Sequence, residues 1–159
     1  MVTLSNSARF VEQLENARKL FGTTTSVFDE ADSGFAPRED LYTVAGHIAH
    51  AADAIEWFLE GAFGGGWDLD LPGSIARARA VTSLNEARAW LDRAFTRAIA
   101  VVGTLTDEEL ALPIADPVIM GNAPKQTVVN ALLDHTAHHR GSLAVYARLV
   151  GKAPPMLYS

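Results

Sequence analysis

Histidines are concentrated in one short segment of this chain. The stretch from Asp134 to Gly141 carries three of the five histidines, His135, His138 and His139. His135 and His139 are four residues apart, so in a helix their imidazoles lie on one face, close enough to share an ion. His138 lies about 100° around the helix axis from His139 and points elsewhere. Neutral imidazole is the commonest metal ligand in proteins, so the pair is a candidate metal site.

The same two histidines interrupt the apolar face of their helix. Read in steps of three and four, that face is Val128, Leu132, His135, His139, Leu143, Tyr146 and Val150. Two adjacent imidazoles are unfavourable in a core unless each ring nitrogen has a partner. A metal ion is one such partner, and hydrogen bonds to backbone or carboxylate groups are the other. The motif by itself leaves both interpretations open.

A second pair of histidines, His47 and His50, lies in another expected helix, which the pattern places from about Pro37 to Phe63. His47 aligns with Val44, Ala51 and Phe58 at the border of the apolar face, whereas His50 points further round. We therefore favour His47 as the residue that faces a partner helix. Turning the helix by half a position reverses that preference.

One histidine from this helix and two from the C-terminal helix make a three-nitrogen set. Three protein ligands with an open fourth position are typical of catalytic zinc sites. A metal held in this way lowers the pKa of bound water or thiol and polarises a carbonyl. A zinc-protease helix needs Glu directly after its first histidine, where this chain has Thr136. Di-iron bundles need Glu-x-x-His pairs, and the sequence contains none.

Composition limits the class of protein. The chain has 159 residues, 48% of them hydrophobic and 20% charged, which is ordinary for one globular domain, and we treat residues 1–159 as such. With a net charge of -6 and no basic run, it does not look like a nucleic-acid-binding protein. It has no cysteine, no signal-peptide pattern and no apolar run of membrane-spanning length. We expect a cytoplasmic protein that does not enter a membrane.

Helical periodicity dominates the chain. Amphipathic helices are expected from Ser5 or Ser7 to about Phe21, over 37–63, from Ser83 to about Val102, and from about Thr127 to Leu149. No segment alternates as a strand does, so the predicted fold class is all-α, a four-helix bundle with long connections. These connections allow crossovers.

A glycine-rich segment follows the second expected helix. Gly64-Gly65-Gly66 ends the helix, and the stretch from Trp67 to Gly73 is predicted to be an ordered loop. An aromatic residue next to Asp68 and Asp70 could form a substrate lid or supply an oxygen ligand. The simpler interpretation, a loop held in place by its tryptophan, is favoured.

Two motifs together resemble the DinB/YfiT-like superfamily. They are Val44-Ala45-Gly46-His47-Ile48-Ala49-His50 and His135-Thr136-Ala137-His138-His139-Arg140-Gly141. The ending, with Gly151 followed by Pro154-Pro155, is also similar to that family. The frequent family pattern has Gln after this glycine, where this chain has Ser142.

The resemblance implies a fold and a metal site. It implies a four-helix bundle, often a homodimer, that binds a divalent metal such as zinc or nickel through three histidines. By position these are His47, His135 and His139. His50 and His138 then become neighbours of the site. Some relatives resemble transferases or isomerases that use small thiols such as bacillithiol or mycothiol, which makes a thiol S-transferase the first functional hypothesis.

Two other hypotheses remain. In a metal-dependent hydrolase, Asp68, Asp70 or Asp134 could assist a metal-bound water, although none is a convincing general base. Arg140 could bind an anionic substrate or pair with a helix carboxylate.

The competing class is a non-catalytic module, either a stress-response bundle with a structural metal or a bundle that binds an apolar ligand. A fourth ligand from the chain would favour that class.

Overall fold

The computed structural model describes residues 5–116 and 118–158. Within these ranges the chain is helical and has no β strand. The elements are α1 (Asn6–Thr25), the 3-10 helix η1 (Glu30–Asp32), α2 (Val44–Phe63), α3 (Leu71–Ala80), α4 (Leu84–Gly103), α5 (Asp107–Ala111) and α6 (Gln126–Leu149). The predicted all-α class is confirmed. The predicted count of four helices is not, because α3 and α5 bring the described helices to six.

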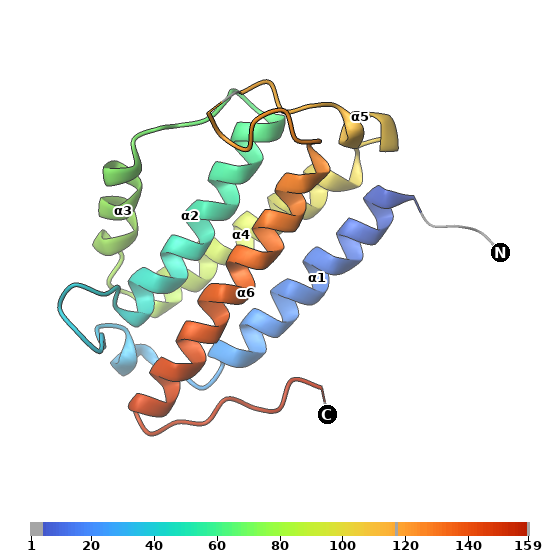
Figure 1. Ribbon diagram of the computed structural model, residues 1–159. Coiled ribbons are helices and arrows are strands. Elements are labelled where there is room, and N and C mark those ends of the chain that lie inside the picture. The colour runs from blue at the N-terminus through green and yellow to red at the C-terminus, as the bar shows by residue number, and fades with distance from the viewer. Residues whose placement is uncertain (1–4, 117, 159) are drawn as a thin grey trace.

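The four longest helices pack side by side as a bundle. α2 lies against α4 and α6, and α1 lies against the same two helices. Figure 1 shows α3 running alongside α2 and returning the chain to the end of the bundle where α2 began. α2 and α4 therefore run in the same direction, which is the kind of crossover that the long connections allow. The histidine-bearing helices α2 and α6 are direct neighbours.

One apolar core joins the long helices. Its largest fully buried side chains come from every one of them and include Leu14, Phe21, Ile48, Ile55, Phe95, Leu132 and Leu143. On α2 the core face is made mostly of alanine, with Ala45, Ala49 and Ala52 all fully buried. Small side chains let neighbouring helices approach closely. This brings longer side chains, such as imidazoles, at the edge of the same face within reach of α6.

Hydroxyl side chains fix where several helices begin. Ser5, Thr43 and Ser83 each accept a hydrogen bond from a backbone N–H in the first turn of α1, α2 and α4. α2 begins at Val44 and not near Pro37, as the sequence pattern suggested, because Thr43 is the capping residue. Thr106 and Glu109 form a reciprocal capping box at α5.

The segment predicted as a loop from Trp67 to Gly73 is partly helical. Asp70 caps α3 through Gly73, and Pro72 occupies the first turn, where a missing N–H costs nothing. α3 docks on α2 through Ala78, which is fully buried, and through a hydrogen bond from the Ser74 hydroxyl to the Asp53 carboxylate. Helix α3 is thus held on α2 three residues beyond His50.

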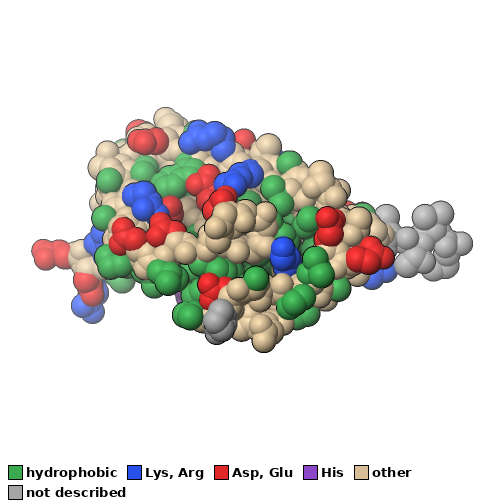
Figure 2. All heavy atoms as spheres, turned by 90° about the horizontal axis from the view of Figure 1, so that it is seen from above, with side chains coloured by type: hydrophobic (Ala, Val, Ile, Leu, Met, Phe, Trp, Pro, Cys, Tyr) green, Lys and Arg blue, Asp and Glu red, His purple; other side chains and the backbone are tan. Residues whose placement is uncertain are grey.

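Charges of both signs are interspersed on the end of the bundle seen from above. Figure 2 shows acidic, basic and apolar side chains mixed on this face, with no field of a single sign. None of the described helices is long and apolar enough to cross a lipid bilayer.

Candidate metal centre

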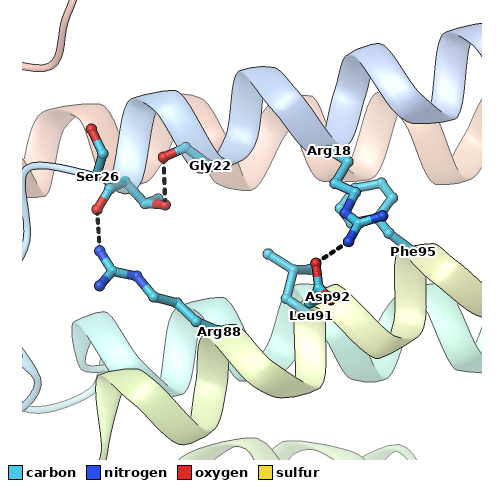
Figure 3. A pocket seen from close by; sticks show the side chains of 8 residues that line it. Arg18, Gly22, Ser26, Arg88, Leu91, Asp92 and Phe95 are labelled. Atoms are coloured by element: carbon cyan, nitrogen blue, oxygen red, sulfur yellow. Dashed lines mark hydrogen bonds and ion pairs between the residues drawn. The ribbon is translucent and has the colours of Figure 1, made fainter.

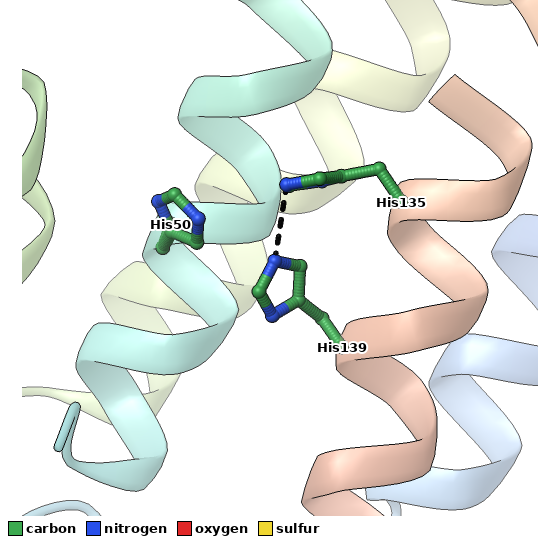
Figure 4. Close-up of side chains that lie close together, drawn as sticks. All are labelled: His50, His135 and His139. Carbon is green, nitrogen blue, oxygen red and sulfur yellow. Dashed lines mark hydrogen bonds between the residues drawn. The ribbon is translucent and has the colours of Figure 1, made fainter. Parts of the chain in front are cut away.

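Four of the five histidines meet between α2 and α6. His47 and His50 extend from α2, and His135 and His139 from α6. The centroid of the His139 ring lies 4.8 Å from that of His47, 4.8 Å from that of His50 and 4.3 Å from that of His135. His139 is therefore the centre of the cluster. Figure 4 shows His50 approaching it from α2 and His135 lying one turn away on α6.

Three of these residues meet the geometric requirement for a shared ion. His50, His135 and His139 each offer a ring nitrogen, and these nitrogens all lie within 4.8 Å of one another. Among the described residues this group contains histidines only, without a carboxylate. His135 and His139 were expected in the set. The third member here is His50, and the set with His47 stays a prediction.

His47 contacts the cluster from its buried side. Its Nε2 lies 2.7 Å from Nδ1 of His139, while Nε2 of His139 lies 3.1 Å from Nε2 of His135. The two neighbours of His139 therefore meet opposite nitrogens of its ring. His47 is only 7% exposed, and its Nδ1 is buried with no hydrogen-bond partner among the described residues.

Burial keeps the imidazoles neutral. It lowers the pKa of His47 and of His135 from 6.5 to about 4, and the neighbouring histidines add to the effect. The pKa of His139 falls to about 2, again mainly through burial and then through His135 and His47. Burial also lowers the pKa of His50, although Asp53 opposes the shift. All four rings are thus uncharged at neutral pH, the form that binds metals.

The donor set fits a divalent metal. Three neutral imidazoles converge from two helices, and a metal would supply the partner that their crowded nitrogens need. His50 and His135 are half-buried and His139 is buried, so one side of the group is open toward solvent. A fourth ligand from outside the chain could bind on that side.

The sequence was also compared with known families. The profile of the DinB superfamily matches residues 13–143, which include all four clustered histidines. The chain belongs to the DinB superfamily. The resemblance seen in the two histidine motifs is thereby confirmed. A comparison with curated proteins found no match.

Solved structures of DinB-like proteins share the fold. A DinB-like protein from Bacillus cereus superposes with a TM-score of 0.75 at 19% identity, over 94% of this chain and 95% of that one. A protein from Streptococcus pneumoniae gives 0.75 at 16% identity, over 94% of both chains. A conserved protein from Enterococcus faecalis gives 0.72 at 17% identity, over 94% of this chain and all of the other (100%). At these identities the similarity establishes the DinB-like fold alone.

Aromatic side chains border the DinB histidine cluster on both sides. The Tyr42 ring stacks on His50 at 4.9 Å between centroids, and the guanidinium carbon of Arg79 in α3 lies 5.1 Å from the centroid of the Tyr42 ring. Phe58, two turns beyond His50 on α2, lies 6.0 Å from His135. Sequence reasoning did not single out these neighbours. The sequence did place His50 close to the same face as His47, because residues three apart on a helix differ by only about 60° and can flank one interface.

The remaining candidates lie away from the trio. His138 is exposed and is not part of the group, although its ring lies 5.0 Å from that of His139. Asp68 faces Arg77 at 3.9 Å, Asp70 caps α3, and Asp134 is exposed on α6. The predicted loop anchor is present, because the Trp67 ring packs directly over Gly61 of α2.

Arg140 does not reach the histidine cluster either. It lines a hollow between α1 and α6 with Gln13, Asn16 and Thr136. Among the described residues it has no hydrogen bond or ion pair, so the expected pairing with a helix carboxylate is not seen.

A larger surface hollow of about 400 Å³ lies between α1 and α4. Figure 3 shows its two arginines already engaged, Arg18 with Asp92 and Arg88 with the backbone oxygen of Thr25 at the end of α1. These contacts tie α1 to α4. We therefore assign the hollow a packing role, and the histidine cluster remains the candidate site of this DinB protein.

Proposed function

We propose that this DinB protein is a metal-dependent enzyme whose divalent metal is held by His50, His135 and His139. The observation that supports it is the convergence of three ring nitrogens within 4.8 Å of one another. Zinc and nickel both suit an all-imidazole site.

The choice of His50 over His47 follows from the geometry around His139. Nε2 of His139 faces His135, whereas His47 meets the ring at Nδ1. A single metal at Nε2 can bind His135 and His50 at the same time, but His47 is then on the far side of the ring. The set with His47, favoured by the sequence, would require His139 to use its other nitrogen.

Three protein ligands favour a catalytic role over a structural one. Structural zinc sites are usually closed by four protein ligands, and catalytic sites keep one position for water or substrate. No carboxylate of the described residues joins the histidine group. When bound, the metal would lower the pKa of a thiol or water at the open position and polarise a nearby carbonyl.

The chain's own side chains shape the open position. His50 and His135 border the solvent side, where the Phe58 ring lies against His135 and the Tyr42 ring against His50. The Tyr42 hydroxyl also lies 3.5 Å from Nδ1 of His50.

The Asp53 carboxylate acts on the pKa of His50, but it is already held by the Ser74 hydroxyl and by Arg77. A site without a free general base favours a nucleophile that needs none once its proton is lost. We infer transfer of a small thiol to an electrophile, in keeping with the thiol-using members that the sequence resembles. Hydrolysis would need a free general base, and Asp53 is already engaged by Ser74 and Arg77.

The first experiment measures metal content. Protein without a metal-binding tag is purified as wild type and as the single variants His50→Gln, His135→Gln and His139→Gln, with His138→Gln as the control. We expect about one metal per wild-type chain and per His138→Gln chain, and a large loss in the other three variants. Each removes one of three ligands, and second-sphere changes alone already cost about 10–100-fold.

Activity is then measured with the loaded protein. The thiols are bacillithiol, mycothiol and glutathione, and the electrophile is 1-chloro-2,4-dinitrobenzene. Thiol consumption that depends on metal and on His135 supports the transferase. A wild type that never binds metal overturns the proposal, and a protein that binds metal tightly but turns over none of the thiols favours a non-catalytic module.

A homodimer and a cytoplasmic location also stay predictions from the sequence.

A further inference from the structure

Two hollows follow one another along α6, and Arg140 lies in the wall of both. The first, of about 220 Å³, lies between α1 and α6 and is also lined by Gln13, Asn16 and Thr136. The second, of about 280 Å³, lies between the later part of α6, the end of α1 and the C-terminal tail. Together these hollows form the α1–α6 furrow. We propose that the furrow binds a carboxylic acid with an apolar chain, and that Arg140 holds its carboxylate.

The guanidinium of Arg140 has unused hydrogen-bonding capacity. The side chain is half-buried, yet within the described part of the chain it makes no hydrogen bond or ion pair. All its N–H donors are therefore available, and their fork matches the two oxygens of a carboxylate. Asn16, which also makes no side-chain hydrogen bond with a described residue, offers a further amide donor to the first hollow.

The charges around the furrow favour an anion. The chain has 19 acidic residues against 13 basic ones, yet no Asp or Glu is among the described residues that line either hollow. Arg140 is joined there by Arg148, which is exposed and already donates to the backbone oxygen of Ala144 at 2.8 Å. One guanidinium is thus entirely free, which suits the single charge of a carboxylate better than the double charge of a phosphate ester.

The remainder of the furrow is mostly aliphatic, which suits a hydrocarbon chain. Its apolar lining includes Leu20, Leu133, Ala144, Pro154 and Leu157. Each CH₂ group that leaves water for such a surface strengthens binding about fourfold. The two hollows together reach the size range of small-molecule pockets, about 300–1,000 Å³. A ligand with both a carboxylate and an apolar chain therefore matches the furrow better than a purely polar anion.

Contacts outside the furrow hold the C-terminal tail in place. Figure 1 shows the chain after α6 turning back past the end of α1. Lys152 anchors this turn, because its Nζ lies 2.7 Å from a carboxylate oxygen of Asp29 and 2.5 Å from one of Asp32. Pro154 and Pro155 follow, and their rings restrict the backbone. The second hollow is consequently formed without a ligand, which lowers the cost of ordering on binding.

Calorimetric titration with octanoate tests the proposal. The protein is kept in EDTA so that no metal at the histidines can bind the carboxylate, which makes the result independent of the proposed metal site. We expect saturable binding of about one octanoate per chain. Acetate lacks the chain and 1-octanol lacks the charge, so each should bind at least about 10-fold more weakly. Absence of octanoate binding overturns the proposal, as does 1-octanol that binds equally well or octyl phosphate that binds more tightly.

Substitutions locate the ligand in the furrow. Arg140→Gln should weaken octanoate binding about 10–100-fold, whereas Arg93→Gln, at an exposed arginine of α4, should leave it unchanged. Gly141→Leu extends into the second hollow, because beyond its chain neighbours and the nearby backbone of its own helix no described atom lies within 4 Å of the added Cβ. It should also weaken binding. Gly22→Leu, which enters the hollow between α1 and α4, is its matched control.

Circular dichroism first confirms that each variant is folded, and Gly141→Leu decides alone if Arg140→Gln is not. Octanoate that binds the folded Arg140→Gln or Gly141→Leu variant as tightly as wild type overturns the assignment. Sedimentation tests the other occupant of such a furrow, a second copy of the chain. A wild-type dimer that binds no octanoate and that Arg140→Gln dissociates would assign the furrow to that second copy and overturn the proposal.

Discussion

At the scale of single residues, the site depends on keeping imidazoles uncharged. Burial between α2 and α6 disfavours the imidazolium form, and each neighbouring ring would repel a second positive charge. A metal consequently need not displace protons from these residues at neutral pH. The same lowered pKa values link the cluster to folding.

Acid should destabilise the metal-free protein through these histidines. In the unfolded chain they take up protons below a pKa of 6.5, whereas in the fold His47 and His135 do so only near 4. As the pH falls below 6.5, the unfolded state binds more protons than the folded state, so the free energy of unfolding decreases. The decrease should continue toward pH 4.

Urea unfolding in EDTA at pH 7.5 and pH 5 measures this effect. Wild type should lose more stability between the two pH values than a His135→Gln/His139→Gln double variant, which lacks two of the titrating groups. Carboxylates titrate equally in both proteins and cancel in the comparison. An equal loss in both proteins would mean that the clustered histidines are not protonated differently in the folded and unfolded states.

At the scale of helices, α2 carries two of the clustered histidines and also anchors the segment that follows it. A Cβ at Gly61 would lie 2.3 Å from Cδ2 and Cε3 of Trp67, so this glycine is required for the ring to lie flat on the helix. The Trp67 ring also contacts Trp57 and Phe58, and Phe58 in turn borders His135. The position of the residue 64–70 connection is thereby coupled to a side chain that borders the histidine cluster.

Replacing Gly61 by alanine should destabilise the protein although alanine is the better helix former. The propensity gain is about 1 kcal/mol, and displacing a packed ring typically costs about 1–3 kcal/mol, so we expect a small net loss of stability. Gly22→Ala in α1 is the control, because beyond its chain neighbours and the nearby backbone of its own helix no described atom lies within 4 Å of the added Cβ. It should gain up to about 1 kcal/mol.

Urea unfolding and tryptophan emission report on the two variants. A red-shifted emission in Gly61→Ala, with none in Gly22→Ala, would show that Trp67 has moved toward solvent. If both variants are stabilised alike, then the Trp67 ring does not pack on α2 as described.

The sequence predicted helices where local signals and burial agreed. Ser83 and the apolar spacing of Leu91, Phe95 and Val102 defined α4, and each of these apolar residues is buried. For α3 the sequence predicted only a helical turn over residues 75–80, and the helix begins earlier, at Leu71. The full helix is stabilised by docking, because Ala78 packs on Gly46 of α2 and Ser74 bonds Asp53, contacts with no local signature. The start of α2 was placed too early because a proline and acidic residues near 37–40 resembled a first turn, whereas Thr43 supplies the cap.

The lack of packing information in the sequence also explains which histidines could be predicted. Spacing alone identified His135 and His139 as a pair on one face, since both lie on the same helix. Choosing between His47 and His50 depends on the rotation of α2 relative to α6, which is set by the packing of alanines in the core. Both histidines reach the interface, and only their contacts with His139 distinguish their roles.

At the scale of the whole molecule, the proposed metal joins two helices that the core already holds together. The buried cluster draws on all four long helices and does not depend on the histidines. The bundle should therefore fold without metal. Metal would then add stability in proportion to its affinity for the folded state.

Thermal unfolding across a zinc titration tests that expectation. A ligand at about 100 times its Kd stabilises the folded state by about 2.7 kcal/mol, which for a chain of this size corresponds to a Tm increase of about 5–11 °C. Wild type should show this increase, and His135→Gln should show little of it, while both give cooperative transitions in EDTA. Because the helices are in place before metal binds, the expected change is a shift of one transition. If EDTA instead abolishes the transition, the metal is needed for folding, and the site is structural despite its three ligands.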